Sequence, residues 1–465
     1  MRSDPILDPF ATLARRDPQA SLVASPREAA TRGEIDDLAS QVAARLRASR
    51  VTPGAVVLLA AANGAGFLAA LLGSRRAGMT TALCDRSAPE GERERIARAL
   101  GAQAEIVCDA PFPRRAEEIG IRLLGTAPRG VEADFVKITS GTSGEPGGVT
   151  VSADALSADD EQLARSMALH AEDRFLAAIP WSHSYGLSSL VLPALRRGSL
   201  LVLPDNGGPW APLLAARAFD ATVIPTVPVF LRTIVEIAPR DAWPASLRKV
   251  ISAGARLAPD EARAFRETFD RAVHVFYGAS ECGGIAYDRE GGAAERGTVG
   301  TPVEGVTIRL EDGTVTVTSA AVASSHVPAP RGSLADGVFR SADLAAWSED
   351  GELRLMGRGD TLINVEGKKV QPLEVEAVLG AMPGVREAVV LGVRAAGSDK
   401  EIVRAVLAGD PGRLSYREVA AWCRSRLAPH KVPRSIVVVD AIPRTGRGKV
   451  DRAALDALDP RDDRA

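Results

Sequence analysis

Cysteine, histidine and lysine are all scarce in this sequence of 465 residues. The four cysteines are widely separated, and none belongs to a C-x-x-C pair. Zinc sites and disulfide frameworks need clustered ligands, so neither is expected, and the cytoplasm is the default location. Most basic residues are arginine, and the lysines are Lys137, Lys249, Lys368, Lys369, Lys400, Lys431 and Lys449.

The sequence also lacks a large net charge and a convincing membrane span. The formal net charge is −2, which gives no indication of a nucleic-acid or anionic-membrane partner. The first residues, MRSDPILDPF, place aspartate and proline where a signal peptide needs an apolar core. The apolar stretch from Gly54 to Gly73 contains Asn63 and internal glycine, so it predicts a buried strand followed by a buried helix.

Apolar residues make up 46% and charged residues 25%, as in a globular protein with two or three domains. Expected strands alternate with expected helices, the strands at 56–60, 80–84 and 104–107 and the helices at 34–49, 67–76 and 90–100. The alternation returns between 174 and 277. This pattern is typical of α/β folds in which helices cover parallel sheets.

The pattern changes toward the C-terminus. Short alternating runs from 297 to 355 predict a small antiparallel β unit. After Gly357 a polar segment leads into a compact α+β pattern, with helices expected at 372–380 and 415–427 and strands at 387–393, 401–407 and 435–439. We therefore expect a large N-terminal domain, 1–359, and a small C-terminal domain, 361–465, with the boundary near Asp360.

The most informative segment is VKITSGTSGEPGGV, from Val136 to Val149. Glycines let several backbone N–H groups converge on an anion, and hydroxyls add further donors. Composition alone also fits an ordinary flexible loop. The candidate phosphate-binding residues are Thr139, Ser140, Gly141, Thr142, Ser143 and Gly144.

The order TSGTSGEPGGV resembles the signature loop of the acyl-adenylate-forming superfamily, which includes acyl- and aryl-CoA ligases and the adenylation domains of peptide synthetases. It is not a Walker loop, because G-x-x-x-x-G-K-[ST] does not occur. Members of this superfamily usually carry a lysine where this sequence has Gly147. The resemblance extends from about Ala30 to Leu455, and it implies a small, mobile C-terminal domain.

Further motifs follow in the order of that superfamily. IPWSHSYGL resembles the segment beside the reacting carboxylate, which implies a catalytic role for His183; alone, His183 could equally be a loop residue without a role. No aspartate stands between Trp181 and Leu187 to hold an amino group, so an amino acid is a less favoured substrate. LRKVISAGARL resembles the lining of the acyl and adenine pockets, at Ala253, Gly254 and Ala255.

VFYGASECGG resembles the aromatic-Gly-x-[Ser/Thr]-Glu motif. By this resemblance Tyr277 and Gly278 contact adenine, Ser280 contacts the α-phosphate, and Glu281 binds Mg²⁺, for which carboxylate oxygen is a usual ligand. Gly283 is expected to leave space in the acyl pocket.

The last motifs lie around the expected hinge and in the C-terminal domain. The resemblance implies that Asp343 and Arg358 contact ribose and phosphate, that Asp360 is the hinge, and that Lys449, in PRTGRGK, bridges the substrate carboxylate and the α-phosphate. A cation there would stabilise charge in the transition state.

For the second half-reaction, the resemblance implies that the C-terminal domain rotates and presents residues 364–369. Gly367 would let a pantetheine chain approach the backbone, and Lys368 and Lys369 could meet coenzyme A or an acidic carrier protein; two adjacent lysines are also common on plain surfaces. We thus expect ATP, Mg²⁺ and coenzyme A, or a phosphopantetheine carrier, with a small aryl or fatty carboxylic acid. Alternatives are a carrier-protein or amine acceptor, and a degenerate protein that binds nucleotide without turnover.

Overall fold

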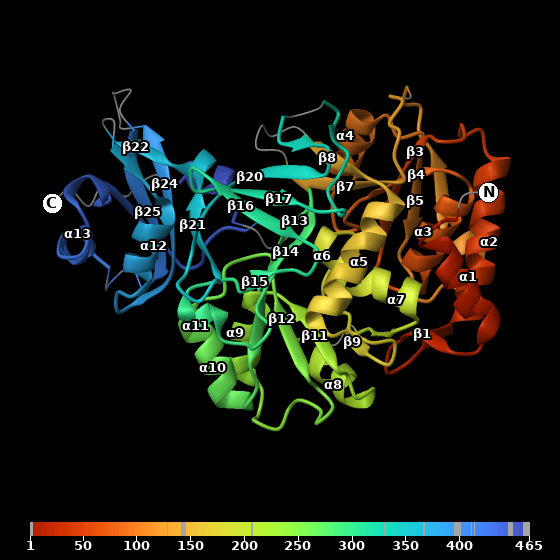
Figure 1. Ribbon diagram of the computed structural model, residues 1–465, viewed down its shortest axis with the longest axis horizontal. Helices are drawn as coiled ribbons and strands as arrows, with labels where there is room; N and C mark the ends of the chain where they lie inside the picture. Colours follow the sequence, from red (N-terminus) through yellow and green to blue (C-terminus); the bar gives the residue numbers. More distant parts are fainter. Residues whose placement is uncertain are drawn as a thin grey trace. The chain divides into compact units, whose positions relative to one another are not determined.

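The computed structural model describes residues 3–127, 129–140, 146–205, 208–329, 332–365, 368–394, 401–410, 412, 414–444 and 450–458. Its backbone packs into two units. The first comprises 1–309, 316–340 and 348–353, and the second comprises 310–315, 341–347 and 354–465. Figure 1 labels the elements of both units. The boundary expected at Asp360 stays a prediction.

A seven-stranded sheet in the first unit has the order β18-β8-β7-β4-β3-β5-β6. Its central strands are parallel, and β6, β8 and β18 pair antiparallel at the two sides. The strands are β3 (Val56–Ala61), β4 (Thr80–Leu83), β5 (Ala104–Cys108), β6 (Gly120–Leu123), β7 (Phe135–Ser140), β8 (Pro146–Val151) and β18 (Ser325–Val327). Short segments between them include η1 (Ala116–Glu118).

The helices of this region follow the sequence pattern closely. They are α1 (Leu7–Arg16), α2 (Arg32–Ala48), α3 (Ala65–Arg76) and α4 (Glu90–Leu100). Helix α2 begins at a capping box in which Thr31 and Glu34 satisfy each other's backbone N–H groups. Strand β3 is wholly buried and α3 is buried from Ala65 to Ser74, which accounts for the long apolar run.

A nine-stranded sheet in the same unit has the order β15-β14-β13-β12-β11-β9-β10-β1-β2. The middle strands are parallel, as expected for a sheet covered by helices. Its strands are β1 (Ser21–Ala24), β2 (Ala29–Thr31), β9 (Arg174–Leu176), β10 (Leu200–Val202), β11 (Val223–Thr226), β12 (Lys249–Ser252), β13 (Val273–Ala279), β14 (Gly283–Tyr287) and β15 (Thr301–Pro302).

Helical segments lie between these strands in the chain, which confirms the predicted α/β class. They are α5 (Ala153–Met167), α6 (Ser184–Gly186), η2 (Leu187–Val191), α7 (Leu192–Arg197), α8 (Ala211–Ala218), α9 (Pro228–Ile237), α10 (Pro259–Phe269) and α11 (Ala293–Arg296). A cluster around Trp243, Phe265 and Phe269 forms an aromatic core under α9 and α10.

The region from 297 to 355, where a small antiparallel β unit was expected, contributes strands to three sheets. A five-stranded sheet does form from β16 (Thr307–Glu311), β17 (Thr314–Thr318), β19 (Leu334–Ala335), β20 (Val338–Trp347) and β21 (Leu353–Arg358). However, β15 joins the nine-stranded sheet and β18 joins the seven-stranded sheet. Alternating hydrophobicity predicts a strand but does not specify its partner.

The C-terminal α+β pattern is present in the second unit. Strands β24 (Val385–Arg394), β25 (Glu401–Gly409) and β26 (Ser435–Val439) form a sheet in that order, and β22 (Ile363–Val365) pairs with β23 (Lys368–Val370). The helices are α12 (Pro372–Gly380), α13 (Tyr416–Arg424) and α14 (Arg452–Asp456), with short turns η3 (Gly359–Thr361) and η4 (Pro429–Lys431). A separate core, including Val390, Leu407 and Val419, is fully buried here.

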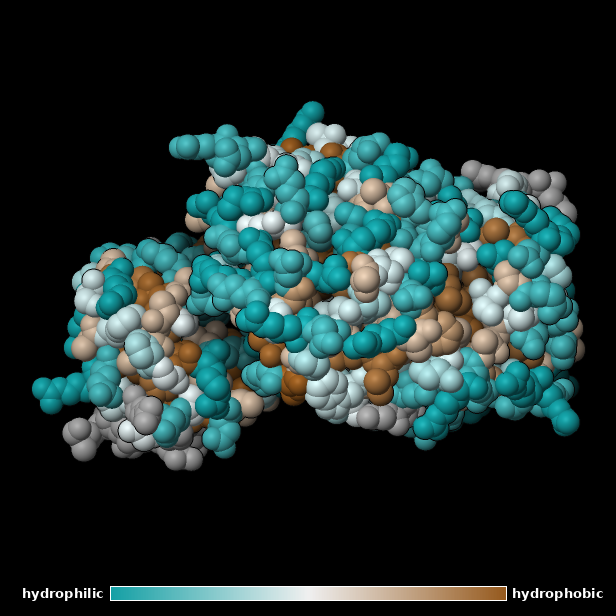
Figure 2. Space-filling model, turned by 90° about the horizontal axis from the view of Figure 1, so that it is seen from below, coloured by the Kyte–Doolittle hydropathy of each residue, from teal (hydrophilic) through white to brown (hydrophobic). Residues whose placement is uncertain are grey.

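The surface carries large apolar side chains only at scattered positions among the described residues, such as Leu123, Leu214 and Met356. On the face in Figure 2, hydrophilic residues predominate and apolar residues form patches between them. None of the helices described is long and apolar enough to cross a membrane.

Candidate active site

The predicted phosphate loop stands in the chain between two paired strands, β7 and β8. Strands β7 and β8 pair antiparallel, with Thr139 opposite Gly147 and Ser140 opposite Pro146. Residues Gly141, Thr142, Ser143 and Gly144 lie outside the described residues, so their phosphate contacts stay a prediction. The hairpin stem stands beside β4 at the carboxyl ends of parallel strands, where ligands of α/β folds usually bind.

The structure explains why residue 147 is a glycine. A Cβ at this position would lie 2.8 Å from the backbone carbonyl oxygen of Val327. That carbonyl belongs to β18, which pairs with β8 through Val327 and Gly148. A side chain at position 147 would therefore have to displace a neighbouring strand, and the usual loop lysine does not fit here.

His183 is held by a carboxylate that the sequence analysis missed. Its Nε2 lies 3.0 Å from Oδ2 of Asp85, just beyond the carboxyl end of β4. Ser87 donates to the other oxygen of Asp85 from both its backbone N–H and its hydroxyl. Burial acts to raise the pKa of Asp85, but the hydrogen bonds from His183 and Ser87 outweigh it and the pKa falls well below its usual range. Asp85 therefore stays ionised and orients the imidazole.

Two predicted motifs meet through a direct hydrogen bond. The Ser184 hydroxyl donates to Oγ of Ser280 at 2.7 Å, which joins the segment of His183 to the segment of Glu281. The neighbouring Tyr185 donates to the carbonyl of Ile251 at 2.8 Å and accepts from the N–H of Thr226 at 3.2 Å. Burial raises the pKa of Tyr185, so its hydroxyl remains a donor. The segments expected to line the acyl pocket thus lie together.

The segment from Tyr277 to Glu281 comprises the end of β13 and the start of the turn to β14. The Cys282 N–H donates to the carbonyl of Ala279, and the backbone carbonyl of Glu281 accepts from Ala323. The side chains of Tyr277, Ser280 and Glu281 are partly exposed, whereas the strands on both sides are mostly buried. The end of β13 and this turn can together present an aromatic ring, a hydroxyl and a carboxylate to a ligand.

The small residues of the expected acyl pocket differ in surroundings. Gly254 has a left-handed backbone, with φ +82°, and a Cβ there would meet only a methyl group of Val227, at 3.8 Å. Gly254 and Ala255 are exposed, and Ala253 is buried. Gly283 does not leave the space we expected, because a Cβ there would lie 2.3 Å from Oδ1 of Asp159. Close packing against a carboxylate explains that glycine.

Asp159, on α5, links three elements around Gly283. Its carboxylate accepts from the N–H of Gly284 at 2.9 Å and from the hydroxyl of Ser188 at 2.6 Å. Asp159 is only 1% exposed. It therefore fixes β14, and with it the turn that carries Glu281, against α5 and η2.

Lys137, on β7, lies in the same interior. It is 2% exposed, and its ammonium forms no hydrogen bond or ion pair with any residue in the described part of the chain. Burial lowers the pKa of Lys137, and the negative charges of Asp159 and Glu281 act in the opposite direction. Lysine is scarce in the sequence, but no motif predicts a role for Lys137.

The predicted ribose contacts and hinge form one ion-pair group within the second unit. Arg358, at the end of β21, makes a two-pronged contact with Asp360, with Nε–Oδ1 at 2.9 Å and Nη2–Oδ2 at 2.7 Å. Its Nη1 lies 3.4 Å from Oδ1 of Asp343 on β20. The hydrogen bond from Arg358 lowers the pKa of Asp360. Asp343, Arg358 and Asp360 are thus close neighbours, as a shared role requires.

Two predicted residues of the C-terminal region lie outside the described residues: Gly367 and Lys449. The stem of the Lys449 loop is described, because Arg444 and Val450 form an isolated antiparallel bridge. The Asp451 N–H also donates to the carbonyl of Pro443. Lys368, at the start of β23, is exposed. The roles of these lysines stay predictions.

The donors present suit magnesium. Mg²⁺ in nucleotide sites is usually held by one or two carboxylates together with substrate phosphates and water. The partly exposed carboxylate of Glu281 is a ligand of this kind. Glu281 would hold the ion, which would neutralise phosphate charge when bound.

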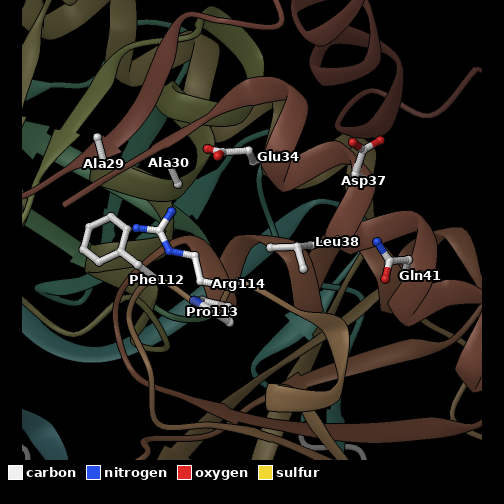
Figure 3. Close-up of a pocket in the computed structure, with 9 residues that line it drawn as sticks. All are labelled: Ala29, Ala30, Glu34, Asp37, Leu38, Gln41, Phe112, Pro113 and Arg114. Atoms are coloured by element: carbon white, nitrogen blue, oxygen red, sulfur yellow. The ribbon is translucent and has the colours of Figure 1, made fainter.

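A separate pocket lies near the N-terminus of α2 (Figure 3). Its lining includes Glu34 and Arg114 and none of the predicted site residues. Glu34 already accepts from the Thr31 N–H, and Arg114 pairs with Glu28 at 3.0 Å. Because none of the predicted site residues lines it, we do not assign this pocket to the predicted reaction.

Sequence reasoning missed Asp85 and Asp159 because each is an isolated acidic residue without a motif. A signal for Asp85 was available, since it directly follows the apolar strand TTALC at the end of which ligands bind. Asp159 stands in an acidic helix, ADDEQ, where it looks like one of several solvated charges.

The geometry and motifs define a class: a nucleotide-binding α/β protein with a separate C-terminal unit. A model of AMP-binding enzymes matches residues 10–318, and a model of the AMP-binding enzyme C-terminal domain matches residues 374–449. The chain belongs to the AMP-binding enzyme family.

Curated relatives include a long-chain-fatty-acid–CoA ligase of Mycobacterium tuberculosis, 27% identical over 339 residues. That match covers 69% of this chain and 66% of the relative, so it spans slightly less than two thirds of the relative. A feruloyl-CoA synthase of an Amycolatopsis species is 28% identical over 475 residues, covering 94% of this chain and 95% of that protein.

Solved structures support the fold over nearly the whole chain. ATP-bound MatB from Rhodopseudomonas palustris has a TM-score of 0.84 at 24% identity and covers 98% of both chains. The o-succinylbenzoate CoA synthetase of Bacillus subtilis, in complex with its acyl-adenylate, has a TM-score of 0.83 at 23% identity, with 97% of this chain covered and 98% of that chain.

Proposed function

We propose that this protein is an AMP-forming acid–thiol ligase that activates a carboxylic acid as its acyl-adenylate and transfers the acyl group to coenzyme A. The observation that carries the proposal is the Ser184–Ser280 hydrogen bond, which joins the His183 segment to the Tyr277–Glu281 segment. The similarity to CoA ligases over most of the chain supports the same activity.

In the first step a carboxylate oxygen attacks the α-phosphorus of ATP, and pyrophosphate leaves. A carboxylate is ionised at neutral pH, so this step needs no general base. The protein contributes orientation and charge neutralisation. We assign His183, held by Asp85, to the substrate carboxylate, and Lys449 to the negative charge that develops between carboxylate and phosphate. Magnesium, held by Glu281, would lower the charge of the phosphates.

In the second step a thiol attacks the acyl carbon, a thioester forms, and AMP leaves. Gly367 and Lys368 are proposed to contact the thiol acceptor in this step. Coenzyme A is the favoured acceptor, because the relatives named above are CoA ligases or synthases. A carrier protein with a phosphopantetheine arm is the second candidate.

The acyl pocket is proposed to take a compact acid, aryl or medium-chain. The Tyr185 ring stands 5.7 Å from the ring of Phe276, and its hydroxyl is fixed to the backbone of β11 and β12. Because the Tyr185 side chain is held by these contacts, it forms a rigid wall of the proposed acyl pocket and would limit the length of an acyl chain.

The test is a panel of aryl and fatty acids with ATP and Mg²⁺, with and without coenzyme A. Pyrophosphate release that depends on one acid, with a thioester formed only when coenzyme A is added, is the expected result. Release without a thioester would favour a carrier-protein or amine acceptor. Absence of release with every acid would favour the degenerate binding protein, for which Gly147 is the specific observation.

A further inference from the structure

Lys137 has an unusual environment for a lysine. Only 2% of it is exposed, and within the described residues no carboxylate is close enough to form an ion pair with it. A buried charge is costly unless a partner compensates it. The carboxylates that act on it electrostatically are those of Asp159 and Glu281. Glu281 belongs to the turn assigned to nucleotide and magnesium.

Lys137 stands on β7 two residues before Thr139, the first residue of the predicted phosphate loop. Side chains alternate along a strand, so Lys137 and Thr139 share one face of the sheet. Lys137 pairs with Leu83 of β4, two residues before Asp85, the partner of His183. The ammonium therefore lies among the elements that build the proposed site.

The loop itself cannot hold the cation that this superfamily usually places at position 147. The backbone carbonyl oxygen of Val327 lies only 2.8 Å from where the Cβ of a side chain at position 147 would be. The described part of the hairpin thus has no lysine in the loop and one buried lysine in the strand that leads into it.

We propose that Lys137 supplies the positive charge that attracts the triphosphate of bound Mg·ATP, in place of the missing loop lysine. This inference rests on the proposed adenylation. The competing role is purely structural, as the counter-charge of the buried Asp159. The two roles predict different effects on the binding of Mg·ATP, which carries phosphates, and of the nucleoside adenosine, which does not.

The test measures equilibrium binding of Mg·ATP and of adenosine to the full-length protein, without acid or turnover. Lys137→Met keeps most of the side-chain volume and removes the charge. The expected result is Mg·ATP binding weaker by about tenfold or more, with adenosine binding unchanged, because a contact to a charged group is worth about this factor. Lys249→Met, at a partly buried lysine of the other sheet, is the matched control and should change neither affinity.

Unchanged Mg·ATP affinity in Lys137→Met, or equal loss for both ligands, would overturn the proposal. Because removing a cation near Asp159 also threatens stability, Lys137→Met/Asp159→Asn is measured beside the single variant. In the double variant, Mg·ATP binding should remain about tenfold weaker than in the wild type. Recovery of the original affinity would assign Lys137 to Asp159 alone. Wild-type protein that binds neither nucleotide would instead contradict the proposed function, and this inference with it.

Discussion

The imidazole Nε2 of His183 lies 3.0 Å from the carboxylate of Asp85, although 98 residues separate them in the chain. Asp85 is itself fixed by two hydrogen bonds from Ser87. This arrangement sets the ring orientation of His183 before a substrate arrives. A histidine oriented in this way can meet a carboxylate with little reorganisation, which is how a positioned group contributes to catalysis.

Asp85→Asn should lower kcat/KM for the acid substrate by about 10- to 100-fold, because a misdirected imidazole positions the carboxylate poorly. The KM for ATP should change little. Steady-state kinetics with each substrate varied in turn gives the two values. Asp109→Asn is the matched control, since Asp109 forms an exposed ion pair with Arg86 and should leave both values unchanged. Equal activity of the two variants would remove Asp85 from the account.

The stability of the protein should depend on Asp85 in acid. The pKa of Asp85 is lower in the folded protein than its ordinary value of 3.8. Such a group stabilises the fold above its ordinary pKa, and the stabilisation is lost as the pH falls through the lower folded value. We therefore measure the melting temperature from neutral pH downward. Below about pH 4 it should fall less steeply with pH in Asp85→Asn than in the wild type. Identical slopes would contradict the lowered pKa.

Lys449→Ala should separate the two half-reactions. Adenylate formation should fall by about two to three orders of magnitude, because a cation at the developing charge is lost. A preformed acyl-adenylate should still be converted to the thioester at nearly the original rate. Lys431→Ala, which removes a lysine paired with Glu374, is the control. Equal loss in both half-reactions would defeat the assignment of Lys449.

Gly147→Lys should not improve the enzyme, despite restoring the residue usual in the superfamily. Its Cβ would press on the carbonyl of Val327, so β18 must shift. Overpacking of this kind costs about 1–3 kcal/mol of folding free energy. Chemical denaturation should show that loss, and the KM for ATP should not fall. A stable variant with tighter ATP binding would mean that the loop can accept the lysine.

Two glycine substitutions should separate open space from close packing. Both Gly254 and Gly283 have positive φ, so alanine costs about 1–3 kcal/mol of backbone strain at either site. Gly283→Ala should be further destabilised, because its methyl group would overlap the Asp159 carboxylate. Gly254→Ala should fold more stably than Gly283→Ala and raise the KM for the acid. Equal melting temperatures would contradict this difference.

Much of the fold was predictable because local patterns were strong. The alternation of apolar strands and amphipathic helices placed β3, α3, β4 and α4 within a few residues of their observed bounds. Strand partners were less accessible, as β15 and β18 show by joining the large sheets. The site motifs were found by their order in the chain. Asp85, Asp159 and Lys137 were not found, because their roles depend on contacts between distant elements.

The central claim is that the protein forms an acyl-adenylate reversibly from ATP and a carboxylic acid. The most direct measurement is exchange of labelled pyrophosphate into ATP, with Mg²⁺ and each acid in turn and without any thiol. The account predicts exchange that requires the acid, that is strongest with a compact aryl or medium-chain acid, and that is lost in Lys449→Ala. Exchange with no acid of the panel, in protein that still binds Mg·ATP, would contradict it.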